Sequence, residues 1–370
     1  MPNKSFFFIP DISGFTSFVK NVEIEHSRHI ISELLELIID ADELGLTMVE
    51  VEGDAIFFFK HNDIPDRAAI LSQVEKTYIK FHEHLKLYET NRICQCGACS
   101  SASELSLKFV ADVGVAEMIT VKGNQKPFGE SVIRVHRLLK NNVASNEYLL
   151  YTNDLNDFTS LEKMNGSWPE SLEDSIQFEG IGSVDFKSIN LNFLESKITK
   201  PEPLKPRKLT NNPYIMEMEI SARREHVYEF LTNMDQRPKW SQDVTLFKYK
   251  KGQVNQVGYK HVCVLDKGSV EFETVTNDFG PDKLVYGETT NEIPIFKEAT
   301  TYFVLSEHDY NTLLRIEVHF DPIPIISWIL KGVVMKKLKA GLSKNLSVLK
   351  AHLEKQAEEE VLEDVKYDVA

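Results

Sequence analysis

The chain has 370 residues, of which 42% are hydrophobic, and this is enough for two domains with separate cores. Its 42 basic side chains are outnumbered by 56 acidic ones and form no stripe, which argues against nucleic acid as a partner. No apolar run is long enough to span a membrane, and the N-terminus lacks the pattern of a signal peptide, so we expect a cytoplasmic protein without stable membrane insertion.

Two short segments near the start each place an aspartate beside a glycine and an apolar run. Asp11 follows the run at 6–9, and Asp54 precedes the run at 56–59. If these runs are paired strands, the two carboxylates meet at one end and form a site for Mg²⁺ or Mn²⁺ carrying a phosphate. Taken singly, each aspartate is also typical of a turn, because Asp11 could cap the turn after it and Gly53-Asp54 is an ordinary hairpin signal.

The rest of the first half alternates between helix and strand patterns. An amphipathic helix between the two aspartates carries one apolar stripe, formed by Ile30, Ile31, Leu34, Leu35, Ile38 and Ile39. Strands are predicted over 50–60, 105–113 and 147–152, a helix after Phe128-Gly129-Glu130, and a final hairpin over 178–194. This mixture predicts an α+β fold.

The order of these motifs resembles the catalytic domain of class III nucleotidyl cyclases, the adenylate and guanylate cyclases. The matching elements are Asp-Ile-Ser-Gly-Phe-Thr, an amphipathic helix, Glu-x-x-Gly-Asp-Ala, a strand, and Phe-Gly-Glu before a helix. The resemblance covers roughly the first half and implies a ferredoxin-like α/β sandwich, a homodimer, and two-metal chemistry on a nucleoside triphosphate. It places Asp11 and Asp54 at the metal positions, Glu50 and Lys126 at the base-selecting positions, and Arg137 at the arginine that steadies the transition state.

Other positions depart from the pattern of that family. Ile133 stands where active members carry an asparagine, and Glu179 stands where they carry a lysine that clamps the phosphates. Lys126 is neither the aspartate of adenylate enzymes nor the small residue of guanylate ones. Losing one electrostatic stabiliser typically costs about 10²–10³-fold in rate, so we expect metal and nucleotide binding without efficient turnover. An active cyclase that makes cyclic nucleotide and pyrophosphate is the alternative.

Three of the four cysteines crowd into one short segment, at Cys94, Cys96 and Cys99. Thiolates at this spacing are typical of a Zn²⁺ site or a redox dithiol, with His82, His84 or a partner subunit supplying a fourth ligand. Reduced thiols that bind no metal are an equal alternative.

A proline-rich stretch at 197–212 is expected to be a stiff, solvated linker between two modules. It divides the chain into a first domain at 1–196, a second domain at 213–356 and an acidic tail at 357–370. The second domain opens with a strand at 214–220 and a short helical region that ends at Trp240. Further alternating strands and one long helix follow, and the apolar stripe of this helix is Leu338, Leu342, Leu346, Leu349 and Leu353.

The order of elements in the second domain resembles the START-like helix-grip (SRPBCC) superfamily, which includes polyketide cyclases. The resemblance implies a curved antiparallel sheet around the last helix, enclosing a cavity for a small hydrophobic ligand. The candidate lining residues are Trp240, Phe272, Tyr286, Phe303, Ile316 and Phe320, although any one of them could simply fill the core. Together the two domains predict a signalling or sensor protein. An enzyme of the second domain that acts on a hydrophobic substrate is a further alternative.

Overall fold

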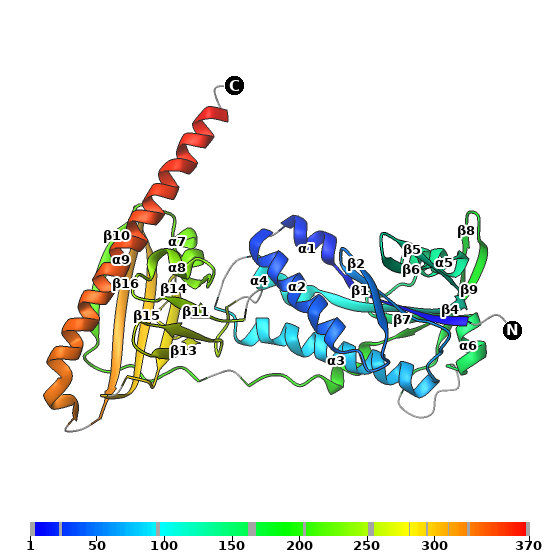
Figure 1. The fold of residues 1–370 in the computed structure, drawn as a ribbon, viewed down its shortest axis with the longest axis horizontal. Coiled ribbons are helices and arrows are strands. Elements are labelled where there is room, and N and C mark those ends of the chain that lie inside the picture. The colour runs from blue at the N-terminus through cyan, green and yellow to red at the C-terminus, as the bar shows by residue number, and fades with distance from the viewer. Residues whose placement is uncertain are drawn as a thin grey trace. The chain divides into compact units, whose positions relative to one another are not determined.

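A computed structural model describes residues 4–21, 24–93, 97–161, 168–202, 205–250, 255–280, 282–293, 295–309, 311–323 and 326–367. The chain divides into two compact units: unit 1 is Met1–Thr90 with Cys96–Pro201, and unit 2 is Asn91–Gln95 with Glu202–Ala370. Each unit contains one seven-stranded sheet and its own helices (Figure 1). The main division, after Pro201, falls within the predicted linker.

The sheet of unit 1 has the strand order β2-β3-β1-β4-β7-β9-β8. Its strands are β1 (Lys4–Ser13), β2 (Thr47–Glu52), β3 (Ala55–Lys60), β4 (Ser106–Val115), β7 (Tyr148–Thr152), β8 (Leu172–Phe178) and β9 (Gly182–Asn190). The helices are α1 (Phe15–Asn21), α2 (Ile24–Asp40), α3 (Arg67–Thr90), α4 (Gly97–Ser101), η1 (Ala102–Glu104), α5 (Glu130–Leu138), α6 (Asn153–Thr159) and η2 (Asn192–Lys197).

The first four strands along the chain pair only antiparallel with one another. Helices α1 and α2 connect β1 to β2, and α3 leads from β3 towards β4. This is the βαββαβ arrangement of ferredoxin-like folds, so the predicted α+β fold class is confirmed. The apolar stripe predicted for the first long helix is present in α2, where Ile30, Ile31, Leu34 and Ile38 are buried.

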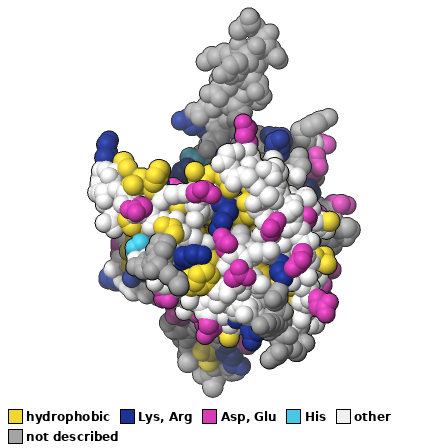
Figure 2. Space-filling view, turned by 90° about the vertical axis from the view of Figure 1, so that its right-hand side faces the viewer, with side chains coloured by type: hydrophobic (Ala, Val, Ile, Leu, Met, Phe, Trp, Pro, Cys, Tyr) yellow, Lys and Arg dark blue, Asp and Glu magenta, His cyan; other side chains and the backbone are white. Residues whose placement is uncertain are grey.

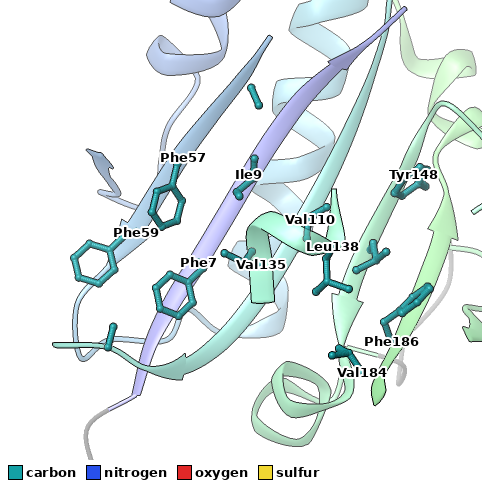
Figure 3. Packing of buried hydrophobic residues seen from close by; sticks show 13 residues of the cluster. Phe7, Ile9, Phe57, Phe59, Val110, Val135, Leu138, Tyr148, Val184 and Phe186 are labelled. Carbon is teal, nitrogen blue, oxygen red and sulfur yellow. The ribbon is translucent and has the colours of Figure 1, made fainter. Parts of the chain in front are cut away.

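The core of unit 1 lies on both faces of β1, an inner strand of the sheet. Phe7 and Ile9 belong to one buried cluster with Val135 and Leu138 of α5, which covers that face (Figure 3). The intervening Phe8 points to the opposite face, because side chains alternate along a strand, and it is also buried. A strand buried on both faces appears in sequence as a continuous apolar run.

Two hairpins depart from the predicted elements of unit 1. The expected strand over 50–60 is interrupted, because Gly53 adopts a positive φ of 67° in the turn between β2 and β3. β5 (Glu117–Val121) and β6 (Asn124–Phe128) form a separate hairpin whose turn, Lys122-Gly123, has φ angles of 49° and 86°, as in a type I′ turn. Most side chains of this hairpin are exposed, so no apolar alternation marks its strands in the sequence.

Unit 2 is one fully antiparallel sheet with the order β10-β16-β15-β14-β13-β12-β11. Its strands are β10 (Tyr214–Ile220), β11 (Leu246–Lys248), β12 (Lys260–Val264), β13 (Ser269–Val275), β14 (Leu284–Thr290), β15 (Phe296–His308) and β16 (Asn311–Pro322). The helices are α7 (Arg224–Thr232), α8 (Arg237–Trp240) and the long α9 (Ile326–Tyr367). Leu346, Leu349 and Leu353 of the predicted stripe on α9 are buried. The order of elements is the one expected, and the assignment to the START-like superfamily stays a prediction.

Two features of unit 2 were not anticipated. The unit includes residues 91–95, which lie between α3 and α4 in the chain, and the hydroxyl of Tyr228 donates to the Ile93 carbonyl at 2.6 Å. Helix α9 also continues to Tyr367, so the expected acidic tail begins as helix. Within the described residues, no helix combines the length and the apolar character needed to cross a membrane.

Candidate functional site

The two predicted metal-binding aspartates of unit 1 lie on neighbouring segments of the sheet. Asp11 of β1 pairs with Ala55 of β3, and Asp54 immediately precedes that residue. The main-chain carbonyl of Asp54 accepts a hydrogen bond from the nitrogen of Ile12 at 3.0 Å. The strand pairing therefore places the two acidic residues on adjoining segments of the sheet, and their joint role as metal ligands stays a prediction.

Burial determines the electrostatics of this aspartate pair. Asp11 is only 8% exposed, and its burial raises its pKa to about 6, with the nearby charge of Asp54 acting in the same direction. Burial also raises the pKa of Asp54. Removing a carboxylate from water disfavours its charged form unless a cation lies close to it, so the buried Asp11 is ionised more easily beside a positive partner.

Lys108 of β4 supplies that positive partner and was missed by the sequence analysis. It lies directly opposite Asp11 in the β1–β4 ladder, and its Nζ is 3.2 Å from Asp11 Oδ2. The charge of Lys108 lowers the pKa of both aspartates against the effect of burial. Within its own segment Lys108 is one polar residue on an alternating strand, and only the register with β1 shows its role.

The aspartate pair fits a divalent cation that arrives together with phosphate. Mg²⁺ in proteins commonly takes one or two carboxylates and completes its shell with phosphate oxygens and water, and Asp11 and Asp54 are such a donor set. Among the described residues, no group of three or more His, Cys, Asp or Glu is placed to hold a metal ion, so phosphate and water would have to supply the other ligands. Binding of a cation at Asp11 would require the ammonium group of Lys108 to move away from this carboxylate.

Replacing Lys108 by Gln is expected to tighten Mn²⁺ binding by about tenfold at pH 8, because it removes the cation that competes for Asp11. Electron paramagnetic resonance of free Mn²⁺ measures the affinity of the full chain. Lys60→Gln is the matched control, since Lys60 pairs with the exposed Asp63 at 2.9 Å. An unchanged or weaker affinity in Lys108→Gln would show that Lys108 does not compete.

The two predicted base-selecting residues contact each other. The Nζ of Lys126, on β6, donates to Glu50 Oε2, on β2, although the residues are 76 positions apart in the sequence. This contact with Lys126 lowers the pKa of Glu50. The pair thus presents an ionised acceptor and a cationic donor side by side. His136 of α5 lies near them, with its Nδ1 3.2 Å from Glu52 Oε2.

Arg137, the one residue predicted to act on the transition state, makes its hydrogen bond outside the aspartate pair. Arg137 donates to the main-chain carbonyl of Glu179, in the turn between β8 and β9. Ile133, where active cyclases carry an asparagine, is 50% exposed on α5. One helical turn before Arg137, Arg134 instead anchors α5 to the sheet through two hydrogen bonds of 2.8 Å to the buried Asp112.

The cysteine segment is only partly described. Cys94 and Cys96 lie outside the described residues, and Cys99 is buried in α4 with its Sγ 3.5 Å from His26 Nδ1. The proposed fourth ligands face carboxylates: His82 Nε2 is 2.8 Å from Glu147, and His84 Nε2 is 2.9 Å from Glu33. A Zn²⁺ or redox role for the segment therefore stays a prediction.

Unit 2 contains a cavity of about 240 Å³ between the sheet, α8 and α9. Trp240, Phe272 and Phe303 line it, as predicted, together with Leu338, Leu342 and Leu346 of α9. The other three candidates are not among the lining residues: Ile316 is buried, Phe320 packs on Phe296 at 4.4 Å between ring centroids, and the hydroxyl of Tyr286 donates to Glu288 at 2.6 Å. A larger hollow of about 780 Å³ in unit 1, next to α3 and η2, contains none of the predicted site residues other than His82.

Comparison with known proteins gave matches of three kinds. Residues 31–148 match a family described as a protein of unknown function (DUF2652). The uncharacterized protein Rv2561/Rv2562 of Mycobacterium tuberculosis is 32% identical over 165 residues, which is 43% of this chain and 73% of that protein.

The third kind is similarity to solved structures. The guanylate cyclase domain of RhGC from Catenaria anguillulae, in complex with GTP, has a TM-score of 0.37 and 15% identity, and the match covers 51% of this chain and 96% of that chain. Protein CV1439 from Chromobacterium violaceum has a TM-score of 0.31 and 18% identity, covering 39% of this chain and 99% of that chain. At TM-scores this low, neither similarity carries an argument about chemistry, which depends on the side chains themselves.

Proposed function

The chain belongs to the family of Rv2561/Rv2562 from Mycobacterium tuberculosis, and from its own side chains we propose that unit 1 binds a nucleoside triphosphate with a divalent cation. The observation that carries the proposal is the meeting of Asp11 and Asp54 on adjoining segments, with Asp11 8% exposed. Asp11 is buried and Asp54 is half-buried, and Lys108 offsets only one of the two negative charges. A bound Mg²⁺ or Mn²⁺ would neutralise the charge of the triphosphate at this place.

The ion pair of Glu50 and Lys126 supports a purine nucleotide as the ligand. Both residues stand at the positions that the resemblance to cyclases gives to base selection, and they contact each other. A purine edge carries N–H donors and ring or carbonyl acceptors. A carboxylate beside an ammonium group complements that edge, since one accepts hydrogen bonds and the other donates them.

Binding without efficient turnover is the form of the activity that these residues support. Ile133 offers no hydrogen bond, Glu179 has the wrong charge to clamp phosphate, and Arg137 donates to a main-chain carbonyl. In the cyclases that unit 1 resembles, the arginine comes from the second subunit. We therefore propose a homodimer through unit 1, with an active cyclase as the alternative outcome of the test below.

Exposed apolar side chains on unit 1 support this dimer. They include Met48 and Val51 of β2, Val121 and Phe128 of the β5–β6 hairpin, and Ile133, which are between 46% and 60% exposed. Figure 2 looks onto the end of unit 1 that carries β5, β6, β8 and α5, and shows hydrophobic side chains exposed among charged ones. A second copy of unit 1 would cover such residues.

For unit 2, the cavity of 240 Å³ supports the binding of a small hydrophobic ligand. With a nucleotide bound by unit 1 and such a ligand bound by unit 2, the whole chain would act as a sensor.

Fluorescent GTP and ATP analogues, titrated into the full chain with Mn²⁺, test the proposal for unit 1. We expect binding that requires Mn²⁺ and that Asp54→Asn weakens by at least about 100-fold. The exposed Asp63 provides the control substitution, Asp63→Asn, which should bind like the wild type. Equal binding in EDTA, or in Asp54→Asn, would contradict the proposal. Release of pyrophosphate with cyclic nucleotide would instead identify an active cyclase.

A further inference from the structure

A buried ion pair forms part of the wall of the cavity in unit 2. Arg237 of α8 and Glu288 of β14 are joined by two hydrogen bonds of 2.6 Å, and their side chains are 8% and 4% exposed. Both residues line the cavity. A buried ion pair often contributes no more stability than apolar residues of the same volume, so its place beside a cavity calls for a reason other than stability.

The charge of this wall is already balanced without a ligand. Burial acts to raise the pKa of Glu288, but the charge of Arg237 and the hydrogen bonds from Arg237 and Tyr286 act against it, and together they lower the pKa. The Tyr286 hydroxyl also donates to Glu288 at 2.6 Å. His261 lies 3.5 Å from the same carboxylate, and burial lowers its pKa to about 4, so it is neutral at physiological pH. The cationic Arg237 and the anionic Glu288 therefore contact each other where little water reaches them.

Two donors of this wall lack a hydrogen-bond partner among the described residues. They are the Nε–H of Arg237 and the indole Nε1–H of Trp240, which are both buried. The two side chains stack, with the guanidinium carbon 4.4 Å from the centroid of the indole ring, and both line the cavity. A buried donor without a partner is unfavourable, so an acceptor that reaches both groups would bind with a gain.

The remaining walls are mostly apolar. They include Phe272, Phe303 and Leu342, and the one further charged member in the described part of the chain is the exposed Asp243, which is paired with Lys344 at 2.7 Å. The volume of about 240 Å³ lies just below the range of about 300–1,000 Å³ that is common for ligand pockets. It admits a skeleton of two fused rings rather than a lipid with two chains.

We propose that unit 2 takes an uncharged, mainly apolar molecule with one acceptor oxygen, a carbonyl or a hydroxyl, which is held by the Nε–H of Arg237 and the Nε1–H of Trp240. The inference rests on the proposed function of unit 2 as a binder of small hydrophobic ligands. A carboxylate is disfavoured because the positive charge of Arg237 is already matched by Glu288, and a second anion would be desolvated beside the first. A pure hydrocarbon is disfavoured because it leaves both donors unpaired.

Three probes of nearly the same shape test the inference on the full chain: 2-acetylnaphthalene, 2-naphthoate and 2-isopropylnaphthalene. Calorimetric titration is expected to show that the ketone binds at least about tenfold more tightly than either of the others. Equal affinities for the ketone and the hydrocarbon, or tighter binding of the carboxylate, overturn the inference while leaving a hydrophobic site in place. Binding of none of the three overturns the proposed function of unit 2 itself.

A substitution that keeps the shape of the wall assigns the effect to a single donor. Trp240→Phe removes the indole N–H and keeps an aromatic ring, and it should reduce the preference for the ketone over the hydrocarbon at least about threefold. Trp168→Phe is the matched control, because Trp168 belongs to unit 1 and packs on Phe193. An unchanged preference in Trp240→Phe overturns the role of Trp240.

Discussion

Replacing Asp11 by Asn is expected to weaken divalent-cation binding by unit 1 strongly and, at the same time, to stabilise the folded protein at pH 8. The pKa of Asp11 rises from 3.8 to about 6 because the carboxylate is buried. The folded state therefore holds the proton of Asp11 more tightly than the unfolded state does. Ionising it between pH 4 and pH 6 lowers the free energy of unfolding, by at most about 3 kcal/mol, and an asparagine is spared this loss.

Urea unfolding at pH 4 and pH 8 measures this effect of Asp11→Asn. At pH 4 the wild type and the variant should differ little, whereas at pH 8 the variant should be the more stable. Asp63→Asn, at an exposed position, should show no such difference between the two pH values. Lower stability of Asp11→Asn at pH 8 would mean that the ion pair with Lys108 outweighs the burial of the carboxylate.

The cation affinity of the same variant completes the argument. Mn²⁺ binding should weaken at least about 100-fold in Asp11→Asn, since a direct ligand is lost. In the wild type the affinity should rise with pH up to about 6 and then level off, because the cation binds the ionised form of Asp11. Retained Mn²⁺ binding in the variant would remove Asp11 from the site. The Asp11→Asn variant would then be more stable than the wild type but poorer at binding metal. This combination is typical of a residue that is kept for function at a cost in stability.

Replacing Arg237 by Leu is expected to destabilise unit 2 by about 3–5 kcal/mol, because it leaves the buried carboxylate of Glu288 without its cation. Only the Tyr286 hydroxyl, at 2.6 Å, and the neutral His261 would then face that charge. The double variant Arg237→Leu/Glu288→Leu should recover most of the loss, since no charge is left buried. A shift in the urea unfolding transition of unit 2 measures both effects.

The exposed pair of Lys260 and Glu271, with Nζ and Oε1 2.9 Å apart, provides the control for this experiment. Lys260→Leu should leave the unfolding transition almost unchanged, because solvent screens an exposed charge. If the double variant at Arg237 and Glu288 stays as unstable as the single one, the ion pair contributes packing rather than charge compensation. Charge compensation would then not explain the stability of the buried pair of Arg237 and Glu288 beside the cavity.

The local sequence pattern was sufficient to predict most elements of the fold and to identify the two aspartates of the candidate site. The run at 6–9 predicted β1, the stripe of apolar residues predicted α2, and alternation predicted β10 through its full length. Asp11 and Asp54 were identified because each adjoins a strand that is itself visible in the sequence. The β5–β6 hairpin was missed, since its exposed side chains carry no period that a buried face would impose.

The partners of those residues were decided only by the tertiary structure. Lys108 faces Asp11 because of the register between β1 and β4, and Lys126 meets Glu50 from a hairpin that local pattern does not reveal. Arg237 and Glu288, 51 positions apart, look like two ordinary surface charges until the fold buries both. The sequence of this chain by itself thus determined where strands, helices and acidic motifs occur, because periodicity and turn chemistry depend only on neighbouring residues. Which charges are buried, and which group neutralises each of them, depends on contacts between distant segments and was decided by the packing alone.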